Sequence, residues 1–202
     1  MNINTLIVYY SRTGTNYALS LWAQEAALNE GSSVRLRKLN DIVDEYTVNK
    51  NPLWKKHKEE TINIPIATSD DLLWADCIIF SSPTYFGNVA TEFKNFIDMQ
   101  GEIWSAGKLK NKLVTAMTTA SCMHGGHEAT IKNIYASMMH WGAIIVPLGY
   151  DDNLPLSCGG NPYGSSVTIE DSRMIEKVKP SVIFQTKKII QITSWMLIGK
   201  SV

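Results

Sequence analysis

Short apolar runs recur along the chain and predict the strands of a parallel sheet. The first, residues 6–10, reads Leu-Ile-Val-Tyr-Tyr. Further runs of this kind lie at 77–80, 113–117 and 143–146. Their apolar residues, many of them β-branched or aromatic and without polar alternation, are typical of strands buried on both faces. Val34 and Leu36 instead alternate with arginines, which predicts a further strand near the edge of the sheet.

Apolar residues at helical spacing fill the segments between these runs. Ala18, Trp22 and Ala26 recur every four residues and predict a helix over 15–30, with Gly31 as its stop. Further helices are expected at 69–75 with Ser69 as N-cap, around 89–97, from about 127 to Gly142, and from Pro180 to Gly199.

Strands that alternate with helices indicate an α/β fold with a doubly wound parallel sheet. Five strands of this kind fit the flavodoxin-like order 2-1-3-4-5, with helices on both faces. We expect a single domain over residues 1–202, because neither repeats nor low-complexity linkers divide the chain. Two segments interrupt the pattern, an irregular excursion at about 40–66 and a loop at about 151–168.

Composition narrows the class of protein. Lysine plus arginine balance aspartate plus glutamate at 19 each, so no basic surplus points to nucleic acid or to an anionic membrane. The three cysteines lack C-x-x-C spacing and the four histidines are not spaced as a metal set, so we expect neither a disulfide framework nor a metal site. No apolar run is long enough for a membrane span or a secretory signal, which predicts a soluble cytoplasmic protein.

The candidate chemistry begins where the first strand ends, at the Ser-Arg-Thr-Gly-Thr-Asn sequence of residues 11–16. Three hydroxyls, an amide and a glycine stand where a strand passes into a helix, whose N-terminus offers free N–H groups and a positive dipole end. This donor set suits a phosphate monoester. The lysine-containing phosphate loop and the dinucleotide Gly-x-Gly-x-x-Gly motif are both absent here. An ordinary N-capped turn is the alternative interpretation, since Ser and Thr are common at such turns.

Two more polar loops are expected at the same end of the sheet. The strand at 77–80 runs into Pro83–Asn88, which holds two aromatic residues and a glycine, and the strand at 113–117 runs into the glycine-containing loop 118–126. In the order 2-1-3-4-5, ligands bind outside the carboxyl ends of strands 1 and 3. A phosphate at one loop and a flat aromatic group between the other two is the arrangement that FMN requires.

Longer motifs resemble the WrbA family of flavodoxin-like NAD(P)H:quinone oxidoreductases. The segment SSPTYFGNVATEFKNFIDMQGEIWSAGKLKNKLV carries the resemblance, which continues at HWGAIIVPLGY and at GGNPYG. Together these motifs cover most of residues 3–165. The resemblance implies that the protein binds FMN, takes electrons from NADH or NADPH and passes two electrons to a quinone. Because the family is typically tetrameric, it also implies a homotetramer.

The same resemblance assigns roles to individual residues. It implies FMN contacts from Ser11, Arg12, Thr13, Gly14, Thr15, Asn16, Pro83, Thr84, Tyr85, Phe86, Gly87, Asn88, Thr118, Thr119, Ala120, Ser121, Gly125, Gly126 and His140. Phe86 and Trp104 would flank the place where nicotinamide and quinone take turns over the flavin in a ping-pong reaction. His140 would reach the flavin of a neighbouring subunit, and no metal ligand is implied.

Some positions depart from the family pattern. Tyr85 stands where the family usually has arginine, and Thr13 replaces an aromatic residue. The third loop lacks the family's Ser-Thr-Gly-Thr-Gly-Gly-Gly and carries Cys122 and His124 instead. Two other functions therefore stay open: an FMN, azo or nitro reductase that uses the same open ring, and a non-enzymatic flavodoxin-type electron carrier. The balanced charge disfavours the carrier, because flavodoxins are usually strongly acidic.

Overall fold

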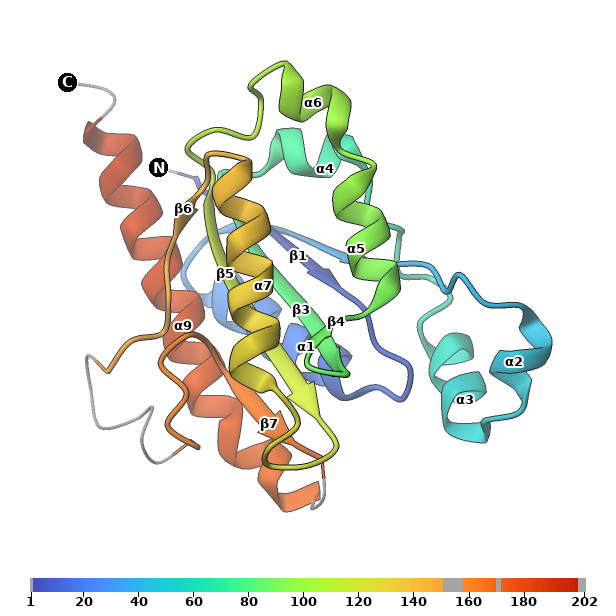
Figure 1. Cartoon of the computed structure of the whole chain (residues 1–202). Coiled ribbons are helices and arrows are strands. Elements are labelled where there is room, and N and C mark those ends of the chain that lie inside the picture. Colours follow the sequence, from blue (N-terminus) through green and yellow to red (C-terminus); the bar gives the residue numbers. More distant parts are fainter. Residues whose placement is uncertain (1, 151–157, 170–171, 200–202) are drawn as a thin grey trace.

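The predicted parallel strands form one sheet. The structure is a computed structural model, and its description here extends to residues 2–150, 158–169 and 172–199. The five predicted strands are β1 (Asn4–Tyr9), β2 (Ser33–Lys38), β3 (Cys77–Tyr85), β5 (Leu113–Ala120) and β6 (Ile144–Ile145). They are parallel and lie in the order β2-β1-β3-β5-β6, which is the predicted order (Figure 1). The α/β fold class is therefore confirmed.

Two further strands extend this sheet beyond the predicted five. β4 (Asn88–Val89) turns back antiparallel to β3, and β7 (Ser166–Thr168) pairs in parallel with the end of β5. The sequence pattern places β7 and Asn88 in loops and Val89 at the start of a helix, and these predictions are wrong. Two or three residues are too few to show a strand period, so backbone pairing with an existing neighbour decides their conformation. Residues 151–157 of the predicted loop 151–168 lie outside the described residues.

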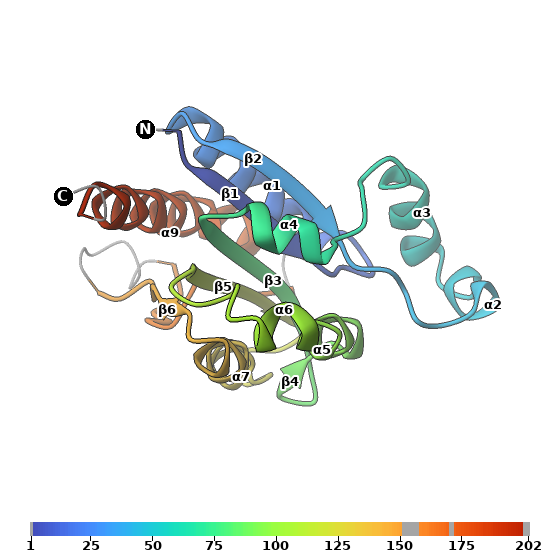
Figure 2. The same ribbon diagram turned by 90° about the horizontal axis from the view of Figure 1, so that it is seen from above.

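Helices cover both faces of the sheet. They are α1 (Thr15–Asn29), α2 (Glu45–Asn49), α3 (Pro52–Glu60), α4 (Ser69–Trp74), α5 (Thr91–Asp98), α6 (Gly101–Ser105), α7 (His127–His140) and α9 (Ser172–Gly199). The view in Figure 2 shows α1 and α9 on one face and α5 and α7 on the other. Gly31 ends α1 as predicted: it has φ +75, and its N–H bonds to the carbonyl of Leu28.

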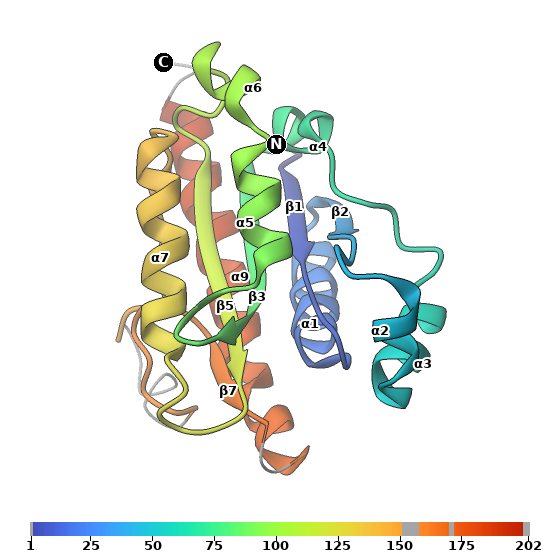
Figure 3. The same cartoon turned by 45° about the vertical axis from the view of Figure 1, so that its right-hand side comes forward.

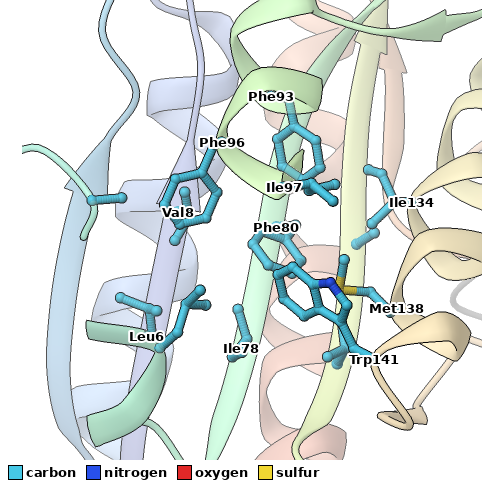
Figure 4. Packing of buried hydrophobic residues seen from close by; sticks show 14 of the residues in the cluster. Leu6, Val8, Ile78, Phe80, Phe93, Phe96, Ile97, Ile134, Met138 and Trp141 are labelled. Carbon is cyan, nitrogen blue, oxygen red and sulfur yellow. The ribbon is translucent and has the colours of Figure 1, made fainter. Parts of the chain in front are cut away.

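Successive residues of the central strands pack into opposite layers. Ile79 of β3 faces the α1 and α9 layer, whereas Ile78 and Phe80 face α5 and α7. Figure 4 shows Phe80 between Phe93 of α5 and Trp141, with ring centroids 5.1 and 6.4 Å apart, respectively. Because both faces are buried, the strands need continuous apolar runs, which is why the sequence pattern identified them.

The excursion at 40–66 is not irregular. It contains α2 and α3, and both helices have a side-chain cap. Asp44 caps α2, and the Asn51 side chain accepts hydrogen bonds from the backbone of α3, whose first residue is Pro52. An N-cap followed by proline is a helix-start signal, and here it starts α3 in a segment without an apolar period.

Two predicted helix starts are also wrong. Thr68, not Ser69, caps α4, because Thr68 and Asp71 form a reciprocal capping box. The last helix begins at Ser172 and includes Pro180, so proline does not open it. Buried Val178 and Val182 anchor α9 on either side of the proline, which removes a single backbone donor. Within the described residues, no helix has both the length and the apolar character needed to cross a membrane.

Candidate cofactor site

The carboxyl ends of β1, β3 and β5 border a cleft of about 330 Å³. All three predicted loops line it. Figure 3 shows these loops at the lower end of the sheet. The lining residues from these loops are Ser11, Arg12, Thr13, Thr15, Asn16, Pro83, Thr84, Tyr85, Thr119, Ala120 and Ser121. Thr47, Asn51 and Trp54 from the α2–α3 segment and Ile169 after β7 complete the lining. No sequence pattern had predicted these last four.

Gly14 shapes the first loop. Its φ of +98° is unfavourable for other residues, and it occupies the N-cap position of α1 without a side-chain cap. Its own N–H donates to Ser11 Oγ at 3.0 Å, which closes the turn. With no side-chain cap on α1, the first-turn N–H groups and the positive end of the helix dipole can serve an anion. The hydroxyls of Ser11 and Thr13 add donors, so the loop fits a phosphate monoester.

Asn16 holds the loop in place through both ends of its side-chain amide. The side chain is 2% exposed; Nδ2 donates to Thr119 Oγ1 at 2.8 Å, and Oδ1 accepts from Ser81 Oγ at 3.0 Å. Thr118 is also fully buried, and its hydroxyl donates to the carbonyl of Ser82. These bonds tie the ends of the three strands together, so both residues position the cleft.

The second loop is a tight hairpin between β3 and β4. Phe86 and Gly87 have φ values of +51° and +74°, as a two-residue hairpin turn requires. Such a φ is unfavourable for a bulky residue. Phe86 is nevertheless fully exposed at the tip, with a relative exposure of 109%. The hairpin therefore holds the ring of Phe86 in water at its tip, next in the chain to Tyr85, which lines the cleft.

The glycines of the third loop let the hairpin approach α7. A Cβ on Gly126, which has φ +96°, would lie 2.7 Å from the Cα of Gly87. A Cβ on Gly125 would lie 2.6 Å from that of Ala120. Gly126 does not line the cleft; it borders a neighbouring hollow of about 530 Å³ between α7 and β7, together with His127. These glycines thus serve packing between the loops.

The α2–α3 segment reaches the cleft through an aromatic clamp. The guanidinium of Arg12 lies 4.5 Å from the ring centroid of Trp54 and 4.5 Å from that of Tyr85. Burial raises the pKa of Tyr85 to about 12, and the nearby guanidinium opposes that rise. Tyr85 is therefore a neutral ring at physiological pH, and Arg12 is the charged member of the clamp.

Trp104 and His140 lie together at the other end of the sheet. Trp104 Nε1 donates to the carbonyl of His140 at 2.8 Å, and both side chains are exposed. His140 is the last residue of α7, a 14-residue helix that starts beside the third loop, so about 20 Å of helix separates it from the cleft. Figures 1 and 3 show α6, which carries Trp104, at the end opposite the hairpin. A single chain therefore does not bring them to Phe86.

The donor set of the cleft fits FMN better than a metal ion. Within the described ranges, no three of the residue types that commonly bind metals gather into a site. The cleft instead combines phosphate donors on the first loop with aromatic residues on the hairpin and a polar third loop. A phosphate group and a flat ring system match these two parts.

Comparison with known proteins agrees with this assignment. The family model described as NADPH-dependent FMN reductase matches residues 1–150. A NAD(P)H dehydrogenase (quinone) of Deinococcus radiodurans is 40% identical over 195 residues, covering 96% of this chain and 98% of the relative. The chain belongs to the NADPH-dependent FMN reductase family. NAD(P)H dehydrogenase (quinone) 3 of Rhizobium meliloti is 32% identical over 97% of this chain and 94% of its own.

Solved structures show that this FMN reductase family member has a flavodoxin-like fold. A flavodoxin-like, WrbA-like protein of Agrobacterium tumefaciens aligns with a TM-score of 0.65 at 19% identity, over 96% of this chain and 99% of that one. Flavodoxin 2 of Bacillus cereus aligns with a TM-score of 0.56 at 17% identity, over 92% and 99%. At these identities the likeness concerns the fold alone.

Proposed function

We propose that this protein is an FMN-dependent NAD(P)H:quinone oxidoreductase. The observation that carries the proposal is the uncapped N-terminus of α1 beside hydroxyl-rich residues 11–16, at the edge where the β3–β4 hairpin presents its aromatic residues. The relatives named NAD(P)H dehydrogenase (quinone) support the choice of donor and acceptor. When bound, FMN would supply the redox chemistry, by accepting a hydride from the nicotinamide and passing two electrons and one proton to the quinone, whose second proton would come from water.

The chain's own residues bind, orient and cover the cofactor. Ser11, Thr13 and the first-turn N–H groups of α1 hold the phosphate, and the hairpin and Thr119–Ser121 border the ring. The bonds from Asn16 to β3 and β5 fix the distance between these two parts. Phe86 stands at the mouth, where nicotinamide and quinone bind in turn.

Binding of FMN to the apoprotein tests the phosphate site. A hydrogen bond to a charged group contributes roughly 1.5–3 kcal/mol. Ser11→Ala should therefore weaken the binding of FMN by about tenfold or more. Riboflavin, which lacks the phosphate, should bind both proteins equally. Ser33→Ala at the start of β2, away from the cleft, serves as the matched control. If Ser11→Ala binds FMN like the wild type, the phosphate site is elsewhere.

We further propose that Trp104 and His140 act on the flavin of a neighbouring subunit, in a homotetramer. Both lie exposed beside a hollow of about 280 Å³, at the end of the sheet far from their own cleft. Mixing an FMN-deficient variant with Trp104→Ala tests this. Shared sites would restore part of the activity when mixed subunits reassemble, whereas independent sites would restore none. Light scattering that shows only a 22.6 kDa species would contradict the assembly itself.

Steady-state kinetics test the shared pocket for the two substrates. If nicotinamide and quinone use one place in turn, double-reciprocal plots at several quinone concentrations should be parallel. Intersecting lines would mean that both bind together. If NADH or NADPH fails to bleach the bound flavin, the electron-carrier alternative replaces the enzyme. We place the protein in the cytoplasm, a reducing compartment, because the number and spacing of its three cysteines do not fit a disulfide framework.

A further inference from the structure

Arg12 is a cation among the residues that line the cleft. Its guanidinium carbon lies over the rings of both Trp54 and Tyr85, 4.5 Å from each ring centroid. A planar guanidinium that contacts aromatic rings through its face keeps the N–H groups of its edge for a ligand. Arg12 belongs to the first loop, Tyr85 to the hairpin strand and Trp54 to α3, so three distant segments fix one charged group.

A hydrogen-bond network behind the clamp fixes its orientation. Arg12 Nε donates to the hydroxyl of Tyr10 at 3.4 Å, and that hydroxyl donates to Asp41 Oδ1 at 3.0 Å. The same Asp41 oxygen accepts from Trp54 Nε1 at 3.1 Å. The buried carboxylate of Glu92 also lies near Tyr10 and Arg12. One edge of the guanidinium is thus turned toward Tyr10, and no ion pair of Arg12 occurs within the described part of the chain.

We propose that Arg12 stabilises the negative charge of the reduced flavin, and that α3 positions it through Trp54. The inference rests on the proposed function. A neutral flavin ring that accepts a hydride from the uncharged dihydronicotinamide ring of NAD(P)H gains one negative charge, and the nicotinamide ring leaves as the oxidised cation. A cation held beside the ring therefore favours the reduced form. The α2–α3 segment, outside the central sheet, becomes part of the redox site.

The geometry favours the ring over the phosphate as the group that Arg12 serves. The guanidinium lies over Tyr85, the residue before the Phe86–Gly87 turn, and so on the hairpin side of the cleft. The phosphate has its own donors at Gly14 and at the N-terminus of α1. The strength of a charge-assisted contact with the ring differs between oxidised and reduced flavin, whereas the strength of a contact with the phosphate does not.

The midpoint potential of bound FMN tests the proposal. Arg12→Met should weaken the binding of reduced FMN, relative to that of oxidised FMN, by about tenfold. This change lowers the two-electron potential by about 30 mV. Arg12→Lys keeps the charge without the planar stack and should retain part of the wild-type potential. Trp54→Leu frees the guanidinium and should lower the potential less than Arg12→Met does. The Arg12→Met/Trp54→Leu double variant should have the same potential as Arg12→Met alone.

Arg35→Met is the matched control. Arg35 also stacks on a tryptophan, with its guanidinium 4.2 Å from the Trp74 ring centroid, but it lies on edge strand β2 and pairs with Asp71. It should leave the potential unchanged. Urea unfolding of each variant separates a folding defect from a change in potential.

Four results would overturn the inference, and each points elsewhere. If Arg12→Met leaves the potential and riboflavin binding unchanged but weakens FMN binding, Arg12 serves the phosphate. An unchanged potential with a raised KM for NADH or NADPH would assign it to the electron donor. A loss of stability alone would make the clamp a docking contact between α3 and the first loop. A wild-type protein that binds no FMN would refute the proposed function itself, before any variant is made.

Discussion

Gly126→Ala tests how closely the hairpin packs against α7. Gly126 has φ +96°, and a Cβ there would lie 2.7 Å from the Cα of Gly87. A side chain in this backbone region costs roughly 1–2 kcal/mol, and an added carbon in a closed contact costs roughly 1–3 kcal/mol. Alanine restricts the unfolded chain, which offsets about 0.4–1 kcal/mol. We therefore expect the free energy of unfolding to fall by about 3 kcal/mol.

Gly31→Ala separates the two contributions. Gly31 also has a positive φ, +75°, but a Cβ there meets nothing within 4 Å. This control should lose only about 1 kcal/mol, the backbone part of the cost. Urea unfolding measures both variants, with an unchanged m-value as the check that the unfolded state is comparable.

The two variants should also differ in cofactor binding. Gly126→Ala must push Gly87 away, because backbone atoms cannot rotate out of the contact, and the hairpin carries Tyr85 and Phe86 with it. FMN affinity should fall in Gly126→Ala and stay unchanged in Gly31→Ala. An equal loss of stability in both variants would refute the close approach of the hairpin to α7.

Three further outcomes follow from single residues. Phe86→Asn should raise the free energy of unfolding by about 1 kcal/mol in a urea titration, because asparagine tolerates the positive φ of Phe86. Steady-state rates should show that kcat/KM falls, because the aromatic ring is lost. Burial lowers the pKa of His57 from its ordinary 6.5, so the unfolded chain binds more protons and stability should fall as pH drops below about 6.5; His57→Gln should flatten that dependence in unfolding curves from pH 7 to pH 5. Gln185→Leu should lower the free energy of unfolding in urea by about 3 kcal/mol. The buried amide of Gln185 accepts from the Ser165 N–H and donates to the Ala116 carbonyl, and the variant leaves both groups unpaired. A loss below 1 kcal/mol would mean that these groups find other partners.

Local patterns were sufficient for the five central strands and for most of the helices packed on them, although they misplaced the starts of α4 and α9. Strands buried on both faces must be continuously apolar, so runs such as 77–80 could be assigned from the sequence alone. The phosphate loop was also visible, because its donors are consecutive residues at one strand-to-helix turn. The order of the five strands then placed the predicted loops along one cleft.

Contacts between distant segments were not visible in the sequence. Trp54 meets Arg12 because α3 folds back over the first loop, and no local period encodes that docking. The buried amide of Asn16 is another example, since the sequence shows a donor but not its partners on β3 and β5. The position of Trp104 could have been inferred: α5 runs opposite to β3, so the residues that follow α5 must lie at the far end of the sheet.

β6 and β7 share one edge of β5, and this arrangement bears on how the family can vary. β6 pairs with Leu113 and Val114, and β7 pairs with Thr118–Ala120. Between them Gly164 lies so close to the Ala116 carbonyl that a Cβ would be 2.0 Å from its oxygen. The chain thus leaves this edge and returns to it at a fixed point. Because doubling the length of a connecting loop costs only about 0.6 kcal/mol, insertions and deletions can accumulate between β6 and Gly164 during evolution while the register on both sides is kept.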